Sequence, residues 1–66
     1  MNAAQCREKA RDAENALDWL TASEYYSRAA DLIPAASGLN ERDVRHLRER
    51  AAQCLHAYRV RIGEAA

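Results

Sequence analysis

The residues of this 66-residue chain best suited to bind a metal or act as a nucleophile are two histidines and two cysteines. His46 and His56 are ten positions apart, or about 80° around a helix, so they do not form the i, i+4 pair that holds a metal. Cys54 and His56 also point to different sides of a helix, which argues against a cysteine–histidine nucleophile. We therefore predict a protein that is not an enzyme, with no catalytic residue, no metal site and no cofactor.

The composition is typical of one small folded domain spanning residues 1–66. Ten basic and ten acidic side chains cancel, and 48% of the residues are apolar. No apolar run approaches the roughly 20 residues of a membrane span. The first segment, MNAAQCREKA, lacks the apolar core of a signal peptide. We expect a cytoplasmic protein that does not contact the membrane and is not drawn to nucleic acid by its total charge.

Glycine and proline occur at only three positions, Pro34, Gly38 and Gly63, so little interrupts helix formation. Pro34 should end one helix, a loop should pass through Ser37 and Gly38, and Gly63 should end the last helix. We predict helices at about 2–17, 19–33 and 41–62, with Asn40 as the N-cap of the third. The expected fold is an all-α, three-helix, up-down-up bundle.

Apolar residues recur at steps of three and four, as on one face of a helix. In the first helix the stripe consists mostly of small residues: Ala3, Cys6, Ala10, Ala13, Leu17 and Leu20. In the third helix the stripe is longer: Val44, Leu47, Ala51, Cys54, Leu55, Tyr58 and Ile62. In such a bundle Cys6 and Cys54 differ by about 15 Å along the axis, too far for a disulfide. Both thiols should be buried and reduced.

The segment LDWLTASEYYSRAADLIP, residues 17–34, resembles the turn and second helix of a tetratricopeptide repeat (TPR). The spacing A-x3-[FY]-x2-A-x4-P is carried by Ala22, Tyr26, Ala29 and Pro34. Thr21 and Glu24 fit a capping box that would begin the second helix near Ala22, whereas the repeat pattern places the break earlier, around Asp18. We favour the earlier break. The resemblance implies a helical hairpin in which Tyr26 is buried.

Two families of three-helix units resemble the whole chain. The first is the microtubule-interacting-and-trafficking (MIT) domain, which the segment LRERAAQCLHAYRVRI resembles in its third helix. In the first two helices the resemblance rests on Lys9, Ala10, Ala16, Trp19, Ala22, Tyr25, Tyr26 and Ala29. In that family a partner's short helical tail lies between helices 2 and 3. The resemblance implies that a partner protein would contact Tyr25, Arg28, Leu32, Leu47, Arg50 and Ala51.

The second family comprises short bacterial regulators of the PerC and AraC-negative-regulator (ANR) type. The residues that resemble its pattern are Ala13, Glu14, Trp19, Ala22, Ser23, Tyr26, Glu41, Arg42, Arg50 and Cys54. This resemblance implies a small regulator, and we favour transcriptional or phage-type host regulation as its setting.

A candidate basic surface runs along the third helix and comprises Arg45, Arg48, His56 and Arg59. Such a stripe could contact phosphates, although Glu41, Asp43 and Glu49 lie within a turn of it and offer acidic partners. We expect a non-enzymatic protein-interaction module that binds a helical segment or face of a partner through a groove between helices 2 and 3. The alternatives are direct nucleic-acid binding through the third helix and an MIT-type adaptor for helical tails. Self-association as a homodimer is also open.

Overall fold

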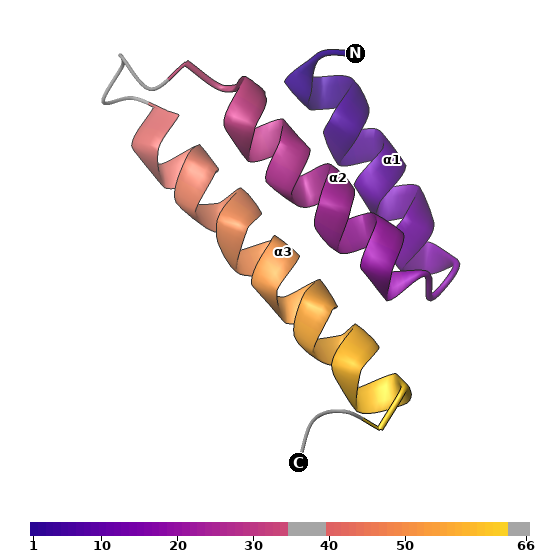
Figure 1. Cartoon of the computed structure of the whole chain (residues 1–66). Coiled ribbons are helices and arrows are strands. Elements are labelled where there is room, and N and C mark those ends of the chain that lie inside the picture. Colours follow the sequence, from indigo (N-terminus) through magenta and orange to yellow (C-terminus); the bar gives the residue numbers. More distant parts are fainter. Residues whose placement is uncertain (35–39, 64–66) are drawn as a thin grey trace.

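The computed structural model describes residues 1–34 and 40–63, which form three helices and no strand. They are α1 (Ala3–Asn15), α2 (Trp19–Leu32) and α3 (Glu41–Arg61). Successive helices run antiparallel (Figure 1), so the predicted all-α, up-down-up three-helix bundle is confirmed. The loop expected at Ser37 and Gly38 lies outside the described residues.

The helices lie side by side with α2 in the middle (Figure 1). α1 and α3 pack against α2 far more extensively than against each other, and the Cα trace measures 39 × 23 × 13 Å. The Cα trace is therefore almost twice as wide as it is thick. This flat arrangement leaves α2 and α3 with a long shared surface.

α1 begins with a capping box that the sequence analysis missed. The Asn2 side chain accepts a hydrogen bond from the Gln5 backbone N–H at 2.8 Å, and the Gln5 side chain accepts from the Asn2 N–H at 2.9 Å. These bonds satisfy two donors at the helix start that would otherwise have no partner.

α1 ends at Asn15, and Leu17 then adopts the left-handed conformation with φ of +60°. The Leu17 N–H donates to the Glu14 carbonyl at 2.9 Å, and the Asp18 N–H donates to the Ala13 carbonyl at 2.8 Å. These two bonds form a Schellman motif, in which the left-handed residue is usually glycine. The predicted apolar stripe of the first helix included Leu17 and Leu20. This prediction is wrong, because α1 ends before both residues. Their side chains are 55% and 37% exposed.

Asp18 is the N-cap of α2 and accepts a hydrogen bond from the Thr21 N–H at 3.4 Å. The predicted break at Asp18 is thus confirmed, and the alternative start near Ala22 is wrong. α2 ends at Leu32, followed by Ile33 with φ of −85° and ψ of 126°. That extended geometry is the one favoured directly before a proline.

α3 begins after Asn40, as predicted, but the Asn40 side chain makes no capping hydrogen bond. Glu41 and Asp43 occupy its first turn, and Arg59 and Arg61 its last, so both ends suit the helix dipole. Gly63 follows with φ of +78°, the left-handed geometry expected of a residue that ends a helix.

The core is built mainly from small side chains. Its buried apolar members are Cys6, Ala10, Ala22, Tyr26, Ala29, Ala30, Leu47, Ala51 and Cys54. Small residues let the helix backbones approach closely, and Tyr26 is buried as predicted. Cys6 and Cys54 are both buried, as predicted, and are not joined to each other. None of the described helices has the length and apolar character needed to cross a membrane.

Candidate functional site

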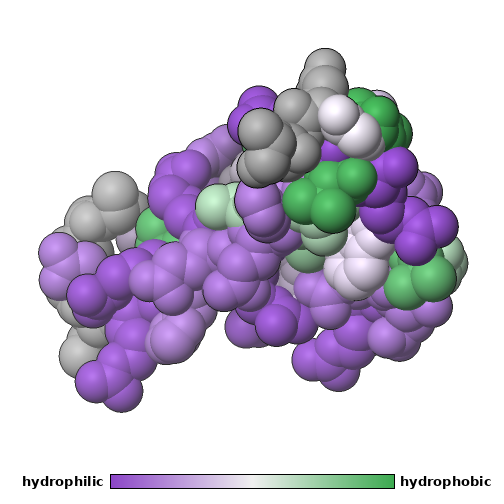
Figure 2. Space-filling model, turned by 90° about the horizontal axis from the view of Figure 1, so that it is seen from below, coloured by the Kyte–Doolittle hydropathy of each residue, from purple (hydrophilic) through white to green (hydrophobic). Residues whose placement is uncertain are grey.

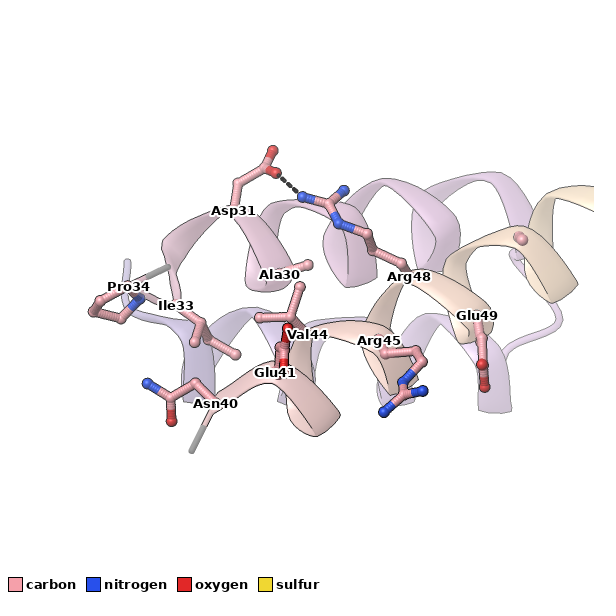
Figure 3. A pocket seen from close by; sticks show the side chains of 11 residues that line it. Ala30, Asp31, Ile33, Pro34, Asn40, Glu41, Val44, Arg45, Arg48 and Glu49 are labelled. Carbon is pink, nitrogen blue, oxygen red and sulfur yellow. Dashed lines mark hydrogen bonds and ion pairs between the residues drawn. The ribbon is translucent and has the colours of Figure 1, made fainter. Parts of the chain in front are cut away.

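The surface between α2 and α3 is hollowed along one side in two adjoining depressions, which we call the α2–α3 groove. The first depression lies between the end of α2 and the start of α3 and includes Ile33, Pro34 and Val44 (Figure 3). The second lies between the start of α2 and the middle of α3 and includes Leu20 and Leu55. The groove thus has apolar residues at both of its ends.

The two depressions share three lining residues, Asp31, Arg48 and Ala52, and so form one continuous feature. The Arg48 guanidinium donates to the Asp31 carboxylate at 3.0 Å across the groove (Figure 3). These side chains are 57% and 67% exposed, and exposed pairs of this kind contribute about 0–1 kcal/mol. A ligand that needs this space therefore displaces the ion pair at little energetic cost.

Small residues line the middle of the groove. Ser23 and Ser27 of α2 face Ala51 and Ala52 of α3 across it. The Ser23 hydroxyl donates to the Leu20 carbonyl at 2.7 Å, so it does not need a hydrogen bond from a ligand. Small residues at a contact allow close approach of a third helix. Leu20 on α2 and Ile33, its C-cap, are thirteen positions apart, so the groove is about 20 Å long, or nearly four turns of helix.

The charges along the groove are mixed. Its acidic lining residues are Glu24, Asp31, Glu41 and Glu49. Its basic lining residues are Arg28, Arg45 and Arg48. A phosphate backbone is attracted by one sign of charge, whereas a peptide with charges of both signs is matched by this surface. The electrostatics of the groove therefore suit protein better than nucleic acid.

The structure separates the six residues expected to contact a partner. Arg28 and Ala51 line the groove, and Leu47 is buried in the core beside it. Tyr25 is two positions from Ser27, about 200° around α2, and therefore faces away from the groove. Its ring packs on the core and under the Arg28 guanidinium, with 5.5 Å between Arg28 Cζ and the ring centroid.

Leu32 and Arg50 also lie away from the groove. Leu32 is seven positions after Tyr25 and so shares its side of α2, where it is 46% exposed. Arg50 is about 200° from Arg48 around α3 and reaches α1 on the opposite face, where its guanidinium donates to Glu14 at 3.0 Å. The expected set therefore spans two faces of the molecule.

Among the groove residues that the sequence analysis did not assign to the site are Leu20, Ser27, Asp31, Ala52 and Leu55. Each lies 80–140° around its helix from a core residue of the same helix, Tyr26 on α2 or Leu47 on α3, at the edge of the apolar stripe. That position is visible in a helical projection. A helical projection does not show, however, which of the two edges of the apolar stripe lies beside the neighbouring helix.

The candidate basic surface consists of exposed side chains in the structure, namely Arg45, Arg48, His56 and Arg59. Arg45 and Arg48 belong to the groove, and Arg48 is paired with Asp31. Among the described residues no group of histidine, cysteine and acidic side chains is placed to hold a metal ion.

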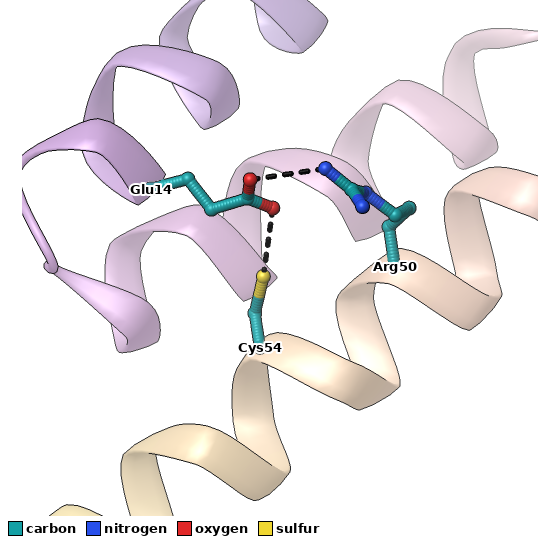
Figure 4. Close-up of polar contacts among 3 residues, drawn as sticks. All are labelled: Glu14, Arg50 and Cys54. Carbon is teal, nitrogen blue, oxygen red and sulfur yellow. Dashed lines mark hydrogen bonds and ion pairs between the residues drawn. The ribbon is translucent and has the colours of Figure 1, made fainter.

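On the face opposite the groove, Glu14 of α1 connects to two residues of α3 (Figure 4). Its carboxylate accepts from the Arg50 guanidinium at 3.0 Å and from the Cys54 thiol at 3.3 Å. Burial, and then the hydrogen bond to Glu14, raise the pKa of Cys54 to about 11. The adjacent Tyr26 hydroxyl and then Glu14 raise the pKa of Arg50 above its usual value. The cluster thus holds a neutral thiol at physiological pH and attaches α1 to α3.

No family model, curated protein or solved structure matches this chain. The resemblances to TPR hairpins, MIT domains and PerC/ANR-type regulators therefore stay predictions.

Proposed function

We propose that this chain is a small, non-enzymatic protein-interaction module that binds an amphipathic helix of a partner protein in the α2–α3 groove. The partner helix would lie along the groove for up to four turns, with apolar side chains at its two ends. Helix-in-groove recognition of this kind uses anchors at i, i+3, i+4 and i+7. The module acts by occupancy, because a helix held in the groove is unavailable to other partners.

The observation that carries the proposal is the combination of a floor of small residues with apolar ends. Ser27, Ala51 and Ala52 leave room for a helix backbone, and Leu20 with Leu55 and Ile33 with Val44 offer apolar contacts at the ends. The ion pair between Asp31 and Arg48 crosses the groove and is weak enough to be opened. Regulation of transcription or of a host by a phage is the setting we favour, with an MIT-type adaptor for helical tails as the alternative.

A groove-filling substitution tests the proposal. Ala52 is exposed and lines both depressions, so Ala52→Trp fills the groove without disturbing the core. Gln53→Trp is the matched control, because Gln53 is the next exposed residue of α3 and points about 100° away. The chain is used as bait in its native host at about 0.3 M salt, where contacts between exposed charges are largely screened. Captured proteins are then compared by mass spectrometry.

We expect one dominant protein to be captured by the wild type and by Gln53→Trp and lost with Ala52→Trp. Capture that is equal for both tryptophan variants would place the binding surface elsewhere. The partner helix is then synthesised as a peptide and titrated against each variant by calorimetry. A negative heat-capacity change is expected for binding in an apolar groove.

Direct nucleic-acid binding by α3 is the competing function, since Arg45, Arg48, His56 and Arg59 are exposed along one stripe. It predicts an affinity for DNA or RNA that falls steeply with salt and is lost in the double variant Arg45→Ala with Arg48→Ala. Fluorescence anisotropy with labelled duplex and single-stranded probes measures both effects. Salt-sensitive binding of DNA or RNA that the arginine double variant loses, with no protein captured at about 0.3 M salt, would replace the groove proposal with this one.

A further inference from the structure

α3 extends well past the other two helices at its C-terminal end. It has 21 residues against 14 in α2, and Leu55 is level with Leu20 because both line the same depression. The seven positions 56–62 therefore extend about 10 Å beyond the start of α2. Figure 1 shows this overhang below the turn between α1 and α2. Together the overhang and the turn form a step, which we call the terminal step.

Large apolar side chains lie on both sides of the terminal step. Leu17 and Leu20 at the turn are 55% and 37% exposed, and Ile62 on the overhang is 52% exposed. Tyr58 is half-buried and continues the core stripe of α3 past the point where α2 begins. Figure 2, which views the molecule from this end, shows hydrophobic side chains in green at the surface. The core side of α3 thus continues beyond the residues that cover it in the described part of the chain, 1–34 and 40–63.

Leu17 is an unusual residue for its position. A left-handed residue after a helix is usually glycine, and another residue type there is strained by contact of its Cβ with the backbone. The Leu17 side chain is mostly exposed, so packing within the described chain does not compensate for this strain. Backbone strain of this kind is concentrated where a side chain serves a contact or a reaction.

We propose that the terminal step is the interface of a homodimer. A two-fold rotation places the two α3 overhangs antiparallel with their core sides together. Ile62 of each chain then lies against Leu17 and Leu20 of the other. The contact is self-complementary, as a two-fold interface requires, because one chain carries both the overhang and the turn that receives it.

The charges of the terminal step fit a second copy of the chain. Arg59 and Arg61 lie in the last turn of α3, and Asp18 lies in the turn that would receive them. A two-fold rotation brings the basic end of each overhang to the turn that carries Asp18 in the other chain. With three large exposed apolar side chains per copy, the interface belongs to the small class whose members bind weakly.

Sedimentation equilibrium tests the proposal on the whole chain at concentrations up to about 0.5 mM, because small interfaces are weak. The wild type should approach a dimer of the 7.4 kDa chain, and Ile62→Asp should reduce its association at least tenfold. Val60→Asp is the matched control, since Val60 is 54% exposed but about 200° from Ile62 around α3. A monomeric wild type, or equal loss with both variants, would refute the proposed interface.

The variant Leu17→Gly distinguishes an effect on dimerisation from an effect on the stability of the monomer. Glycine removes the strain at φ of +60°, so the variant should unfold at a higher temperature than the wild type when both are monomeric. It should nevertheless dimerise less, because the exposed leucine contact is lost. A variant that is more stable but associates as the wild type does would show that Leu17 takes no part in the interface.

A mixed disulfide tests the antiparallel geometry directly. A chain with Leu17→Cys is mixed with a chain with Ile62→Cys under mild oxidation, and the native thiols Cys6 and Cys54 do not interfere because they are buried. The mixture should form a disulfide-linked pair of the two different chains. A chain with Val60→Cys is the control partner for Leu17→Cys, and linking it equally fast would contradict the arrangement.

Discussion

At the scale of single residues, Cys54 is the group whose environment changes its chemistry most. The residue is 3% exposed, its thiol donates to Glu14 at 3.3 Å, and its pKa rises from 9.0 to about 11. Because the thiolate is the reactive form of cysteine, Cys54 is expected to be inert at neutral pH. Its role is structural, since it joins Glu14 and Arg50 in holding α1 against α3.

The raised pKa makes the stability of the fold depend on pH. The folded state favours the protonated thiol, so this contribution is fully present below about pH 9 and is lost as the pH rises towards 11. The free energy of unfolding should fall over this window by no more than about 3 kcal/mol. Urea unfolding at pH 8, 9, 10 and 11 measures the fall.

Cys54→Ala is the control for this prediction, because it removes the thiol and leaves every other ionisable side chain of the protein in place. The variant should be less stable at pH 8 but should lose less stability than the wild type between pH 9 and 11. Parallel curves for the two proteins would show that the Cys54 thiol does not titrate differently in the folded and unfolded states.

The sequence predicted which residues are buried better than it predicted the face of the molecule on which an exposed residue lies. Tyr26 and both cysteines were predicted to be buried and are. Arg50, in contrast, was placed in the groove but contacts Glu14 on the other face. The apolar stripe of a helix has two edges. Which edge lies beside a neighbouring helix is decided by how the helices cross, and this depends on contacts between residues far apart in the sequence.

At the scale of elements, the helix ends illustrate which local signals are reliable. The break at Asp18 was predicted correctly, and α2 ends at Leu32, one residue before the end that Pro34 predicted. The end of α1 was missed by two residues, because the left-handed position is held by Leu17 rather than by glycine. A leucine carries no sequence signal for this geometry, whereas Gly63 does.

The two asparagine caps offer a matched comparison of local stabilisation. The Asn2 side chain accepts a hydrogen bond from Gln5 in a capping box, whereas the Asn40 side chain makes no capping bond. Asn2→Ala should therefore destabilise the fold by about 1 kcal/mol, which lowers the unfolding temperature of a domain this small by about 4–8 °C. Asn40→Ala should have a clearly smaller effect.

Differential scanning fluorimetry or circular dichroism at one fixed protein concentration measures both substitutions. The ordering of the two variants is the informative result, because each replaces the same residue type at a helix start. A larger effect at Asn40 would mean that its side chain contributes to stability through contacts other than a cap.

At the scale of the whole molecule, the sequence predicted three antiparallel helices but not their flat arrangement. The small residues of α1, such as Cys6 and Ala10, allow close packing on α2. The longer side chains of Tyr26 and Leu47 fill the space towards α3. The small residues of α1 and the larger core residues between α2 and α3 can both be read from the sequence. The overhang of α3 cannot, because it depends on how far the helices are shifted along one another when they pack.

The proposed homodimer makes the stability of the whole molecule depend on its concentration. A domain of 66 residues with a core of small side chains has little stability to spare, and association shifts the unfolding equilibrium by mass action. The unfolding temperature of the wild type should therefore rise by several degrees between about 5 and 500 µM. Ile62→Asp should abolish this rise, and Val60→Asp should keep it. A wild-type unfolding temperature that is constant over this range would mean that the terminal step does not associate, and that the strain at Leu17 serves something other than a second copy of the chain.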